Sequence, residues 1–131
     1  MKTIITGISW FLLGAAALHA LFMVCELFPW RLPILLRIVS KKLPELPGAG
    51  EGRFTDAQRK LVANIVRNAG IYNAIVAGGL FWAAIGGESA ADVARVLLIG
   101  AAVAGVFGTA TLKSPITAVQ ALVGIIGFFL V

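Results

Sequence analysis

His19 and Glu26 are the two side chains whose type and setting are best suited to chemistry. Both lie in an apolar stretch, residues 4–28, and they are seven positions apart, so a helix places them on one face. Seven residues separate their Cα atoms by about 10 Å along the helix axis. This is too far for the pair to chelate one metal ion as residues four positions apart would. No metal ligands and no cofactor are assigned from the sequence. The two groups could instead flank a small substrate or share a water molecule.

The two groups suit proton transfer. His19 could carry a proton near neutral pH, and Glu26 could be its partner or a second acid–base group. Polar side chains elsewhere in the chain are predicted to orient a substrate by hydrogen bonds. These are Trp30, Asn64, Asn68, Tyr72, Asn73, Thr109 and Gln120.

Long apolar stretches must position these residues. The chain is 60% hydrophobic and 13% charged, whereas soluble domains have about 25% charged residues. A bilayer span needs about 20 apolar residues in a helix. We therefore predict an all-α fold, a transmembrane four-helix bundle forming one domain over residues 1–131. The predicted spans are 4–28, 57–85, 90–112 and 115–131, with a basic loop at 29–56.

Capping residues mark the starts of three helices. Thr55-Asp56-Ala57-Gln58 is typical of a capping box, in which the Thr hydroxyl and the Gln side chain each satisfy a backbone N–H. Ser89 with Asp92 suggests the same arrangement for the third span. Ser114-Pro115 predicts a cap followed by proline at the first position of the fourth.

The basic residues indicate topology and not a nucleic-acid partner. The formal charge is +5, but seven of the eleven basic residues fall between the first two spans. These are Arg31, Arg37, Lys41, Lys42, Arg53, Arg59 and Lys60. The positive-inside rule puts this connection in the cytoplasm, so we expect a bacterial inner-membrane protein with both termini outside.

The first connection is also predicted to hold a short interfacial helix. Apolar residues recur there at helical spacing, with basic residues on the opposite side. They are Leu32, Leu35, Leu36, Val39 and Leu43. The basic face could bind anionic membrane lipids, or its charges could serve only to fix topology.

Topology brings the polar side chains to one depth. Glu26 lies near the cytoplasmic end of the first span, Asn64, Asn68 and Tyr72 share a face of the second, and Thr109 and Gln120 lie toward the same boundary. Asn73 falls about 180° from Asn64 on the helical wheel. Because polar groups in a span usually face a bundle interior or a cavity, we predict a vestibule open to the cytoplasmic side. Alternatively, these groups bond to one another and only hold the bundle together.

Small residues are expected to set the helix packing. Ala101 with Gly105, and Ala104 with Gly108, are small-xxx-small pairs, which let helix backbones approach closely. We favour packing within the chain, while the same residues could mediate a homo-oligomer.

The residues also carry a family resemblance. His19 to Trp30, Asn68-Ala69-Gly70-Ile71-Tyr72-Asn73, residues 104–111 and Val119-Gln120 together resemble the domain-of-unknown-function 1304 family of small four-helix membrane proteins. The resemblance implies a membrane location and a four-helix fold, and it implies that His19, Glu26, Asn68, Tyr72, Asn73 and Gln120 form one pattern. Members usually have Glu where this chain has Leu18 and Gln where it has Ala69.

Three classes of function remain open. The one we favour is a binding protein or small enzyme acting by acid–base chemistry on an apolar or lipid-like molecule. The second is a proton-coupled transporter working as a dimer, similar in size to the small multidrug-resistance transporters. The third is a non-catalytic accessory subunit of the membrane.

Overall fold

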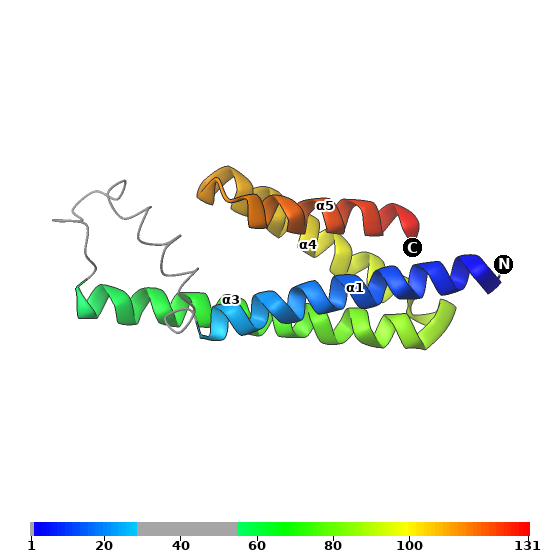
Figure 1. Ribbon diagram of the computed structural model, residues 1–131, viewed down its shortest axis with the longest axis horizontal. Coiled ribbons are helices and arrows are strands. Elements are labelled where there is room, and N and C mark those ends of the chain that lie inside the picture. The colour runs from blue at the N-terminus through cyan, green and yellow to red at the C-terminus, as the bar shows by residue number, and fades with distance from the viewer. Residues whose placement is uncertain (1, 29–54) are drawn as a thin grey trace. The chain divides into compact units, whose positions relative to one another are not determined.

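The computed structural model describes residues 2–28 and 55–131, and over these ranges it is all-α, as predicted (Figure 1). The helices are α1 (Lys2–Leu27), α3 (Asp56–Gly86), the short 3-10 helix η3 (Gly87–Ala90), α4 (Ala91–Leu112) and α5 (Pro115–Leu130). The predicted interfacial helix, the rest of the basic loop before Thr55, and Trp30 lie outside the described residues.

Three of these helices are long and apolar enough to cross a membrane. They are α1 over Gly7–Leu27, α3, and α4. Helix α5 is apolar but has 16 residues, which gives about 24 Å of helix at 1.5 Å per residue. The large apolar side chains left exposed on all four helices, such as Trp10, Ile85, Phe107 and Phe129, are those expected of a protein surrounded by lipid.

Two of the three predicted caps are confirmed. The Thr55 N–H donates to Gln58 Oε1 at 2.9 Å, and the Gln58 N–H donates to Thr55 Oγ1 at 3.2 Å, so the capping box starts α3. Ser114 Oγ accepts from the Ile116 N–H at 3.3 Å, ahead of Pro115 in the first turn of α5.

The predicted cap at Ser89 is wrong. Helix α4 begins after Ala90 without a side-chain cap, because Ser89 lies inside η3. Its hydroxyl donates backwards to the Gly86 carbonyl at 3.0 Å. Ser89 therefore satisfies an unpaired carbonyl at the end of α3 instead of an N–H at the start of α4.

The helices contribute to two compact units. The first unit contains Met1–His19 and Ile75–Val131, and the second contains Ala20–Ala74. Helices α1 and α3 each contribute to both units, whereas α4 and α5 belong entirely to the first.

The core of the first unit is built from small and medium apolar side chains. Leu80 of α3 and Leu98 of α4 are fully buried. Around them pack buried residues of α1, α3, η3 and α4: Leu12, Ala15, Ala16, Ala83, Ala84, Ala90 and Ala94. So many alanines let the helices approach closely, since lipid supplies little hydrophobic force to bring them together.

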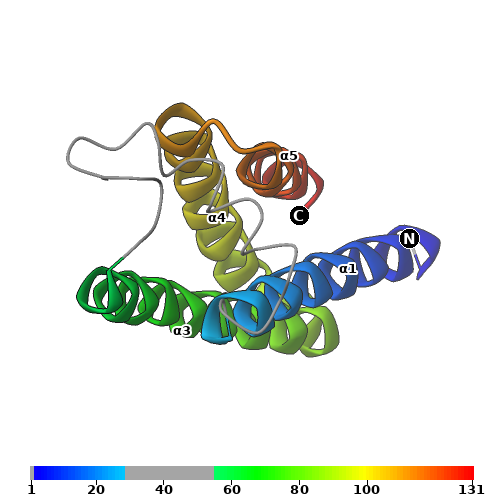
Figure 2. The ribbon, with the colours of Figure 1, turned by 60° about the vertical axis from the view of Figure 1, so that its left-hand side comes forward.

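Helices α4 and α5 form an antiparallel pair in backbone contact (Figure 2). A Cβ on Gly105 would collide with the Ala121 backbone and lie 2.8 Å from the Thr117 carbonyl oxygen. A Cβ on Gly124 would lie 2.6 Å from the Leu98 carbonyl oxygen. The small residues predicted to pack within the chain therefore do so at this seam.

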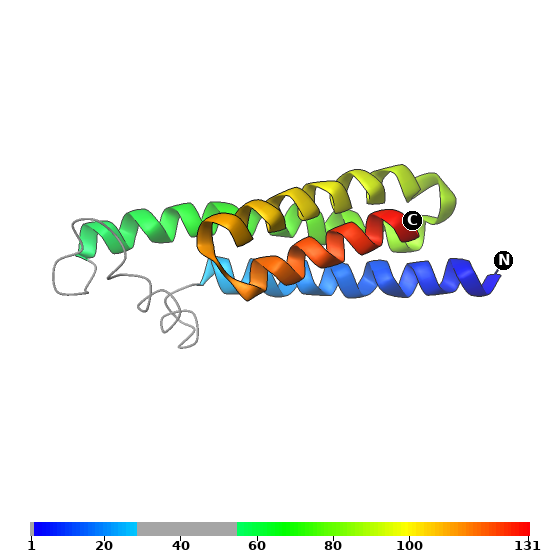
Figure 3. The ribbon, with the colours of Figure 1, turned by 90° about the horizontal axis from the view of Figure 1, so that it is seen from above.

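In the second unit the end of α1 lies against α3 at Gly70. A Cβ on Gly70 would lie 3.2 Å from both Glu26 Cβ and the Leu27 backbone N. The 14 residues of α3 that precede Gly70, Asp56 to Ala69, therefore extend about 21 Å beyond the end of α1 at 1.5 Å per residue. Figure 3 shows this projecting end of α3 in green, past the cyan end of α1.

Candidate functional site

The candidate site lies in the second unit, where Glu26 of α1 meets Asn73 of α3. Asn73 Nδ2 donates a hydrogen bond to Glu26 Oε2 at 2.6 Å. Both side chains are half-buried. The carboxyl group is therefore held by an amide from a different helix while part of its surface stays accessible.

The close approach of the two helices positions this pair. Gly70 lies three residues before Asn73, so both are on the face of α3 that turns toward α1. Because Gly70 has no side chain, the backbone of α1 near Glu26 and Leu27 can sit directly against it. The Asn73 amide then reaches the carboxyl group.

Arg67 completes this face of α3, three residues before Gly70. Its Nε donates to the Leu27 carbonyl oxygen at 3.4 Å. The last carbonyls of a helix have no partner within the helix, and a cation is favourable at that end. Arg67 therefore stabilises the C-terminus of α1 next to Glu26.

Three other predicted site residues of α3 are on its opposite side. Asn64, Asn68 and Tyr72 are exposed, and Tyr72 is 62% accessible. At 100° per residue, Asn68 and Tyr72 lie about 160–200° from Gly70 around the helix. The second unit thus brings Asn73 to Glu26 and turns these three residues away. From their similar depth in the membrane we had expected them to meet Glu26, and they do not. Their role in binding a substrate stays a prediction.

His19 belongs to the first unit, where it is 1% exposed. It continues the buried stripe of α1 that runs through Leu12, Ala15 and Ala16, at helical spacing. A polar side chain at such a position must have its hydrogen-bonding needs met inside the protein. His19 is thus part of the packed interior, and its catalytic role stays a prediction.

The hydroxyl groups of Thr109 and Thr117 are used within the α4–α5 pair. The Thr109 hydroxyl, which has one proton, lies 2.7 Å from the Gly105 carbonyl oxygen and 3.1 Å from Thr117 Oγ1. The Thr117 hydroxyl donates to the Ser114 carbonyl at 2.8 Å. Thr109 therefore links the two helices. Gln120 of α5 is half-buried, and substrate binding by either residue stays a prediction.

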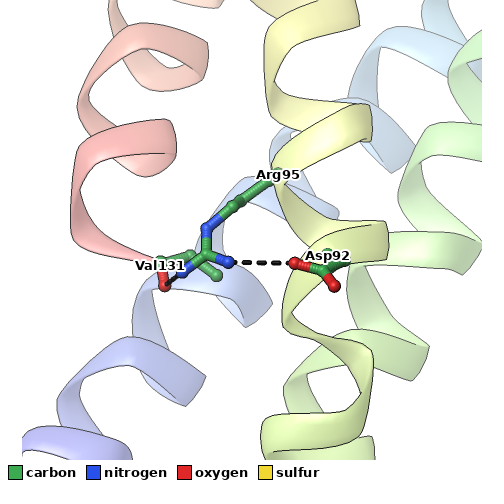
Figure 4. A network of polar contacts seen from close by, with 3 residues as sticks. All are labelled: Asp92, Arg95 and Val131. Atoms are coloured by element: carbon green, nitrogen blue, oxygen red, sulfur yellow. Dashed lines mark hydrogen bonds and ion pairs between the residues drawn. The ribbon is translucent and has the colours of Figure 1, made fainter.

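A second polar cluster closes the other end of the same pair of helices (Figure 4). Arg95 forms an ion pair with Asp92 at 3.0 Å and also donates to the Val131 carbonyl. Because Asp92 is 93% exposed, this surface ion pair adds little stability. The bond to Val131 ties the end of α5 to the first turns of α4, a structural role.

Two residues of the site were not selected from the sequence. Arg67 and Gly70 carry no catalytic group, yet they set the approach of α1 and α3. The sequence signal for Gly70 was a glycine inside a long helix, which usually has a packing reason. Arg67 had no comparable signal, because its acceptor is a backbone carbonyl 40 residues away.

In residues 2–28 and 55–131, no three His, Cys, Asp and Glu side chains gather as ligands for a metal ion. The absence of a metal and of a cofactor stays a prediction for the whole chain. The chemistry available at the described site is hydrogen bonding and proton exchange by one carboxyl group.

Comparison with known proteins identifies a family. A family model described as "Protein of unknown function (DUF1304)" matches residues 13–131. No curated protein and no solved structure matches the chain. The matched range includes both Glu26 and Asn73, and also His19.

Proposed function

The chain belongs to the DUF1304 family of proteins of unknown function, and we propose that it is a membrane protein that binds a small apolar or lipid-like molecule at the Glu26 carboxyl group. The ligand would donate a hydrogen bond, from a hydroxyl or amine, to that carboxyl. Its apolar portion would lie along α1, where Phe22 and Met23 are on the same side as Glu26.

The observation that carries the proposal is the Glu26–Asn73 pair. A carboxyl group can accept several hydrogen bonds, and the Asn73 amide at 2.6 Å satisfies one of them. The group is half-buried and lies in the last turn of a helix able to cross the membrane. Ionisable side chains in such segments are costly and usually serve binding or proton transfer.

His19 is assigned to proton transfer in this proposal. Within Gly7–Leu27 the ionisable side chains are His19, Cys25 and Glu26, and histidine exchanges protons near neutral pH. Because His19 is buried, His19→Gln, which retains much of the volume and polarity, tests the role better than His19→Ala. We expect the His19→Gln variant to stay folded and to retain the bound molecule. Any chemical conversion of that molecule by the protein should be lost.

The experiment is to identify the small molecules that copurify with the protein, by mass spectrometry of the intact detergent-solubilised protein and of its lipid extract. We expect Glu26→Gln to lose a bound molecule that the wild type retains. Asp92→Asn is the matched control, because it neutralises an exposed carboxylate of the first unit. If the wild type and Glu26→Gln carry the same molecules in the same amounts, the binding proposal is wrong.

We also propose that the basic connection before α3 is cytoplasmic, that the membrane is the bacterial inner membrane, and that both termini are outside. The excess of Lys and Arg in that connection supports this orientation. In a Cys25→Ser background, Ser89→Cys should react with a membrane-impermeant maleimide in intact cells. Lys113→Cys should react only after the membrane is permeabilised, and the opposite pattern would reverse the topology.

A non-catalytic accessory subunit is the second candidate. The paired hydroxyl groups of Thr109 and Thr117 and the Arg95–Val131 bond support it, because they use polar groups for packing alone. This candidate requires neither His19 nor Glu26 for activity. It is favoured if cells that carry the Glu26→Gln variant or the His19→Gln variant have the same phenotype as cells that carry the wild-type gene.

A further inference from the structure

We propose that the molecule bound at Glu26 is an amine carried on an apolar body and held through its protonated ammonium group. This inference rests on the binding function proposed above and narrows it, because that function admits either a hydroxyl or an amine as the donor. Three features of the second unit favour a cation. They are the Glu26–Asn73 bond, the direction of Arg67, and the side chains beside the carboxyl group.

The Glu26–Asn73 bond indicates the charge of the carboxyl group. Asn73 Nδ2 lies 2.6 Å from Glu26 Oε2, whereas N–H···O bonds in proteins are usually about 2.9 Å long. Hydrogen bonds to an ionised acceptor are shorter and stronger than those to a neutral one. The bond therefore fits an ionised carboxylate, which within the membrane-crossing stretch Gly7–Leu27 is stabilised by a positive partner.

The side chains described around Glu26 do not provide this partner. In residues 2–28 and 55–131, no Lys or Arg forms an ion pair with Glu26, and Arg67 directs its Nε to the Leu27 carbonyl oxygen. A divalent metal ion is a poor substitute, because Ca²⁺ and Mg²⁺ take about six or more oxygen ligands. Over the same ranges, no three His, Cys, Asp and Glu side chains gather as metal ligands. The bound molecule therefore supplies the positive charge.

Phe22 and Met23 give the site an apolar side that suits an ammonium group. They precede Glu26 by four and three residues, so on a helix their side chains are neighbours of the carboxyl group. Both are half-buried. The face of an aromatic ring attracts a cation, and a neutral alcohol gains no such attraction. Because the membrane-crossing stretch of α1 ends at Leu27, the ammonium group lies near the headgroups and the apolar body extends along α1 into the hydrocarbon.

A matched pair of ligands, dodecylamine and dodecanol, tests the charge, because they share one alkyl chain and differ only in the head group. Native mass spectrometry of the full chain in detergent counts the bound molecules. We expect the wild type to bind dodecylamine at least about tenfold more tightly than dodecanol, and Glu26→Gln to lose this preference. Asp92→Asn, in the first unit, should keep it. Phe22→Leu should weaken dodecylamine binding about threefold and leave dodecanol binding unchanged.

A second pair of ligands distinguishes a lipid headgroup from a free amine. Phosphatidylethanolamine has N–H donors on its ammonium group, whereas phosphatidylcholine has none. Preferential retention of phosphatidylethanolamine, together with dodecylamine, would support the amine and assign it to a lipid headgroup. A preference for dodecylamine alone would support a free apolar amine.

The same measurements separate failure of this inference from failure of the proposed function. Equal binding of dodecylamine and dodecanol by the wild type would overturn the amine, whether or not Glu26→Gln folds. If Glu26→Gln then loses both ligands, the binding function at Glu26 stands with a neutral donor as its ligand. If Glu26→Gln binds both ligands as the wild type does, both proposals are wrong.

Discussion

The α4–α5 pair and the meeting of α1 with α3 in the second unit use polar groups in opposite ways. In the α4–α5 pair the backbones touch through glycines, and the Thr109 and Thr117 hydroxyls bond to nearby carbonyls and to each other. In the second unit a half-buried carboxyl group and an amide meet through their side chains. The first arrangement uses its polar groups for packing, whereas the second keeps an ionisable group accessible.

The comparison indicates where each region tolerates change. A backbone seam depends on the absence of side-chain atoms, so any added carbon disrupts it. A side-chain pair can be altered without moving the backbone. We therefore expect substitutions in α4 and α5 to affect folding, and substitutions at Glu26 and Asn73 to affect binding.

The largest effect is expected from Gly105→Val. A Cβ at Gly105 meets the backbone of Ala121, which cannot move aside as a flexible side chain could. We expect a loss of about 3 kcal/mol in unfolding free energy, measured by denaturation in mixed micelles. Gly100→Ala is the control on the same helix, because nothing lies within 4 Å of its added Cβ, and it should change stability little. A stable Gly105→Val protein would contradict the backbone contact.

A double-mutant cycle of Glu26→Gln and Asn73→Leu measures the second region. We expect a coupling energy of about 1–2 kcal/mol, within the range for hydrogen bonds between membrane helices, from the same denaturation assay. Each single variant should remain folded and inserted. A coupling energy near zero would mean that the 2.6 Å bond does not hold the two helices together.

Lys113 allows a smaller, stabilising change. It has a φ of 49° at the end of α4, a left-handed conformation in which a Cβ is unfavourable. Lys113→Gly should be more stable than Lys113→Ala by about 0.5–1 kcal/mol, with both variants lacking the charge. Equal melting temperatures for these two variants would show that the turn carries no such strain.

The smallest effect is expected for Thr117→Val. The Thr109–Thr117 contact joins two neutral hydroxyl groups at 3.1 Å, and such bonds contribute about 0.6 kcal/mol on average between membrane helices. A cycle with Thr109→Val should therefore give a smaller coupling energy than Glu26 with Asn73. If it is larger, the contrast between the two regions has to be abandoned.

The helical fold and most of its ends could be predicted because their causes are local. Three of the four apolar stretches are long enough to cross a bilayer, and Thr55 and Ser114 cap the residues that follow them. Ser89 was misassigned because the chain forms a 3-10 turn there, and the same hydroxyl can bond forward or backward.

The site was harder to predict because it depends on helix rotation. Glu26 was found as an ionisable group in an apolar stretch. A helical wheel separates Asn73 from Asn64, but it does not say which of them faces α1. Gly70 decides this, since the close contact with Leu27 turns the Asn73 side of α3 toward α1.

The two-residue turn between α4 and α5, at Lys113 and Ser114, has a consequence for biogenesis. Helix α5 alone is shorter than the hydrocarbon core, so the insertion machinery would retain it poorly as an independent segment. Joined to α4 through the glycine seam, it can leave the translocon as the second arm of a preformed helical hairpin. Helix α5 thus depends on α4 for its entry into the lipid.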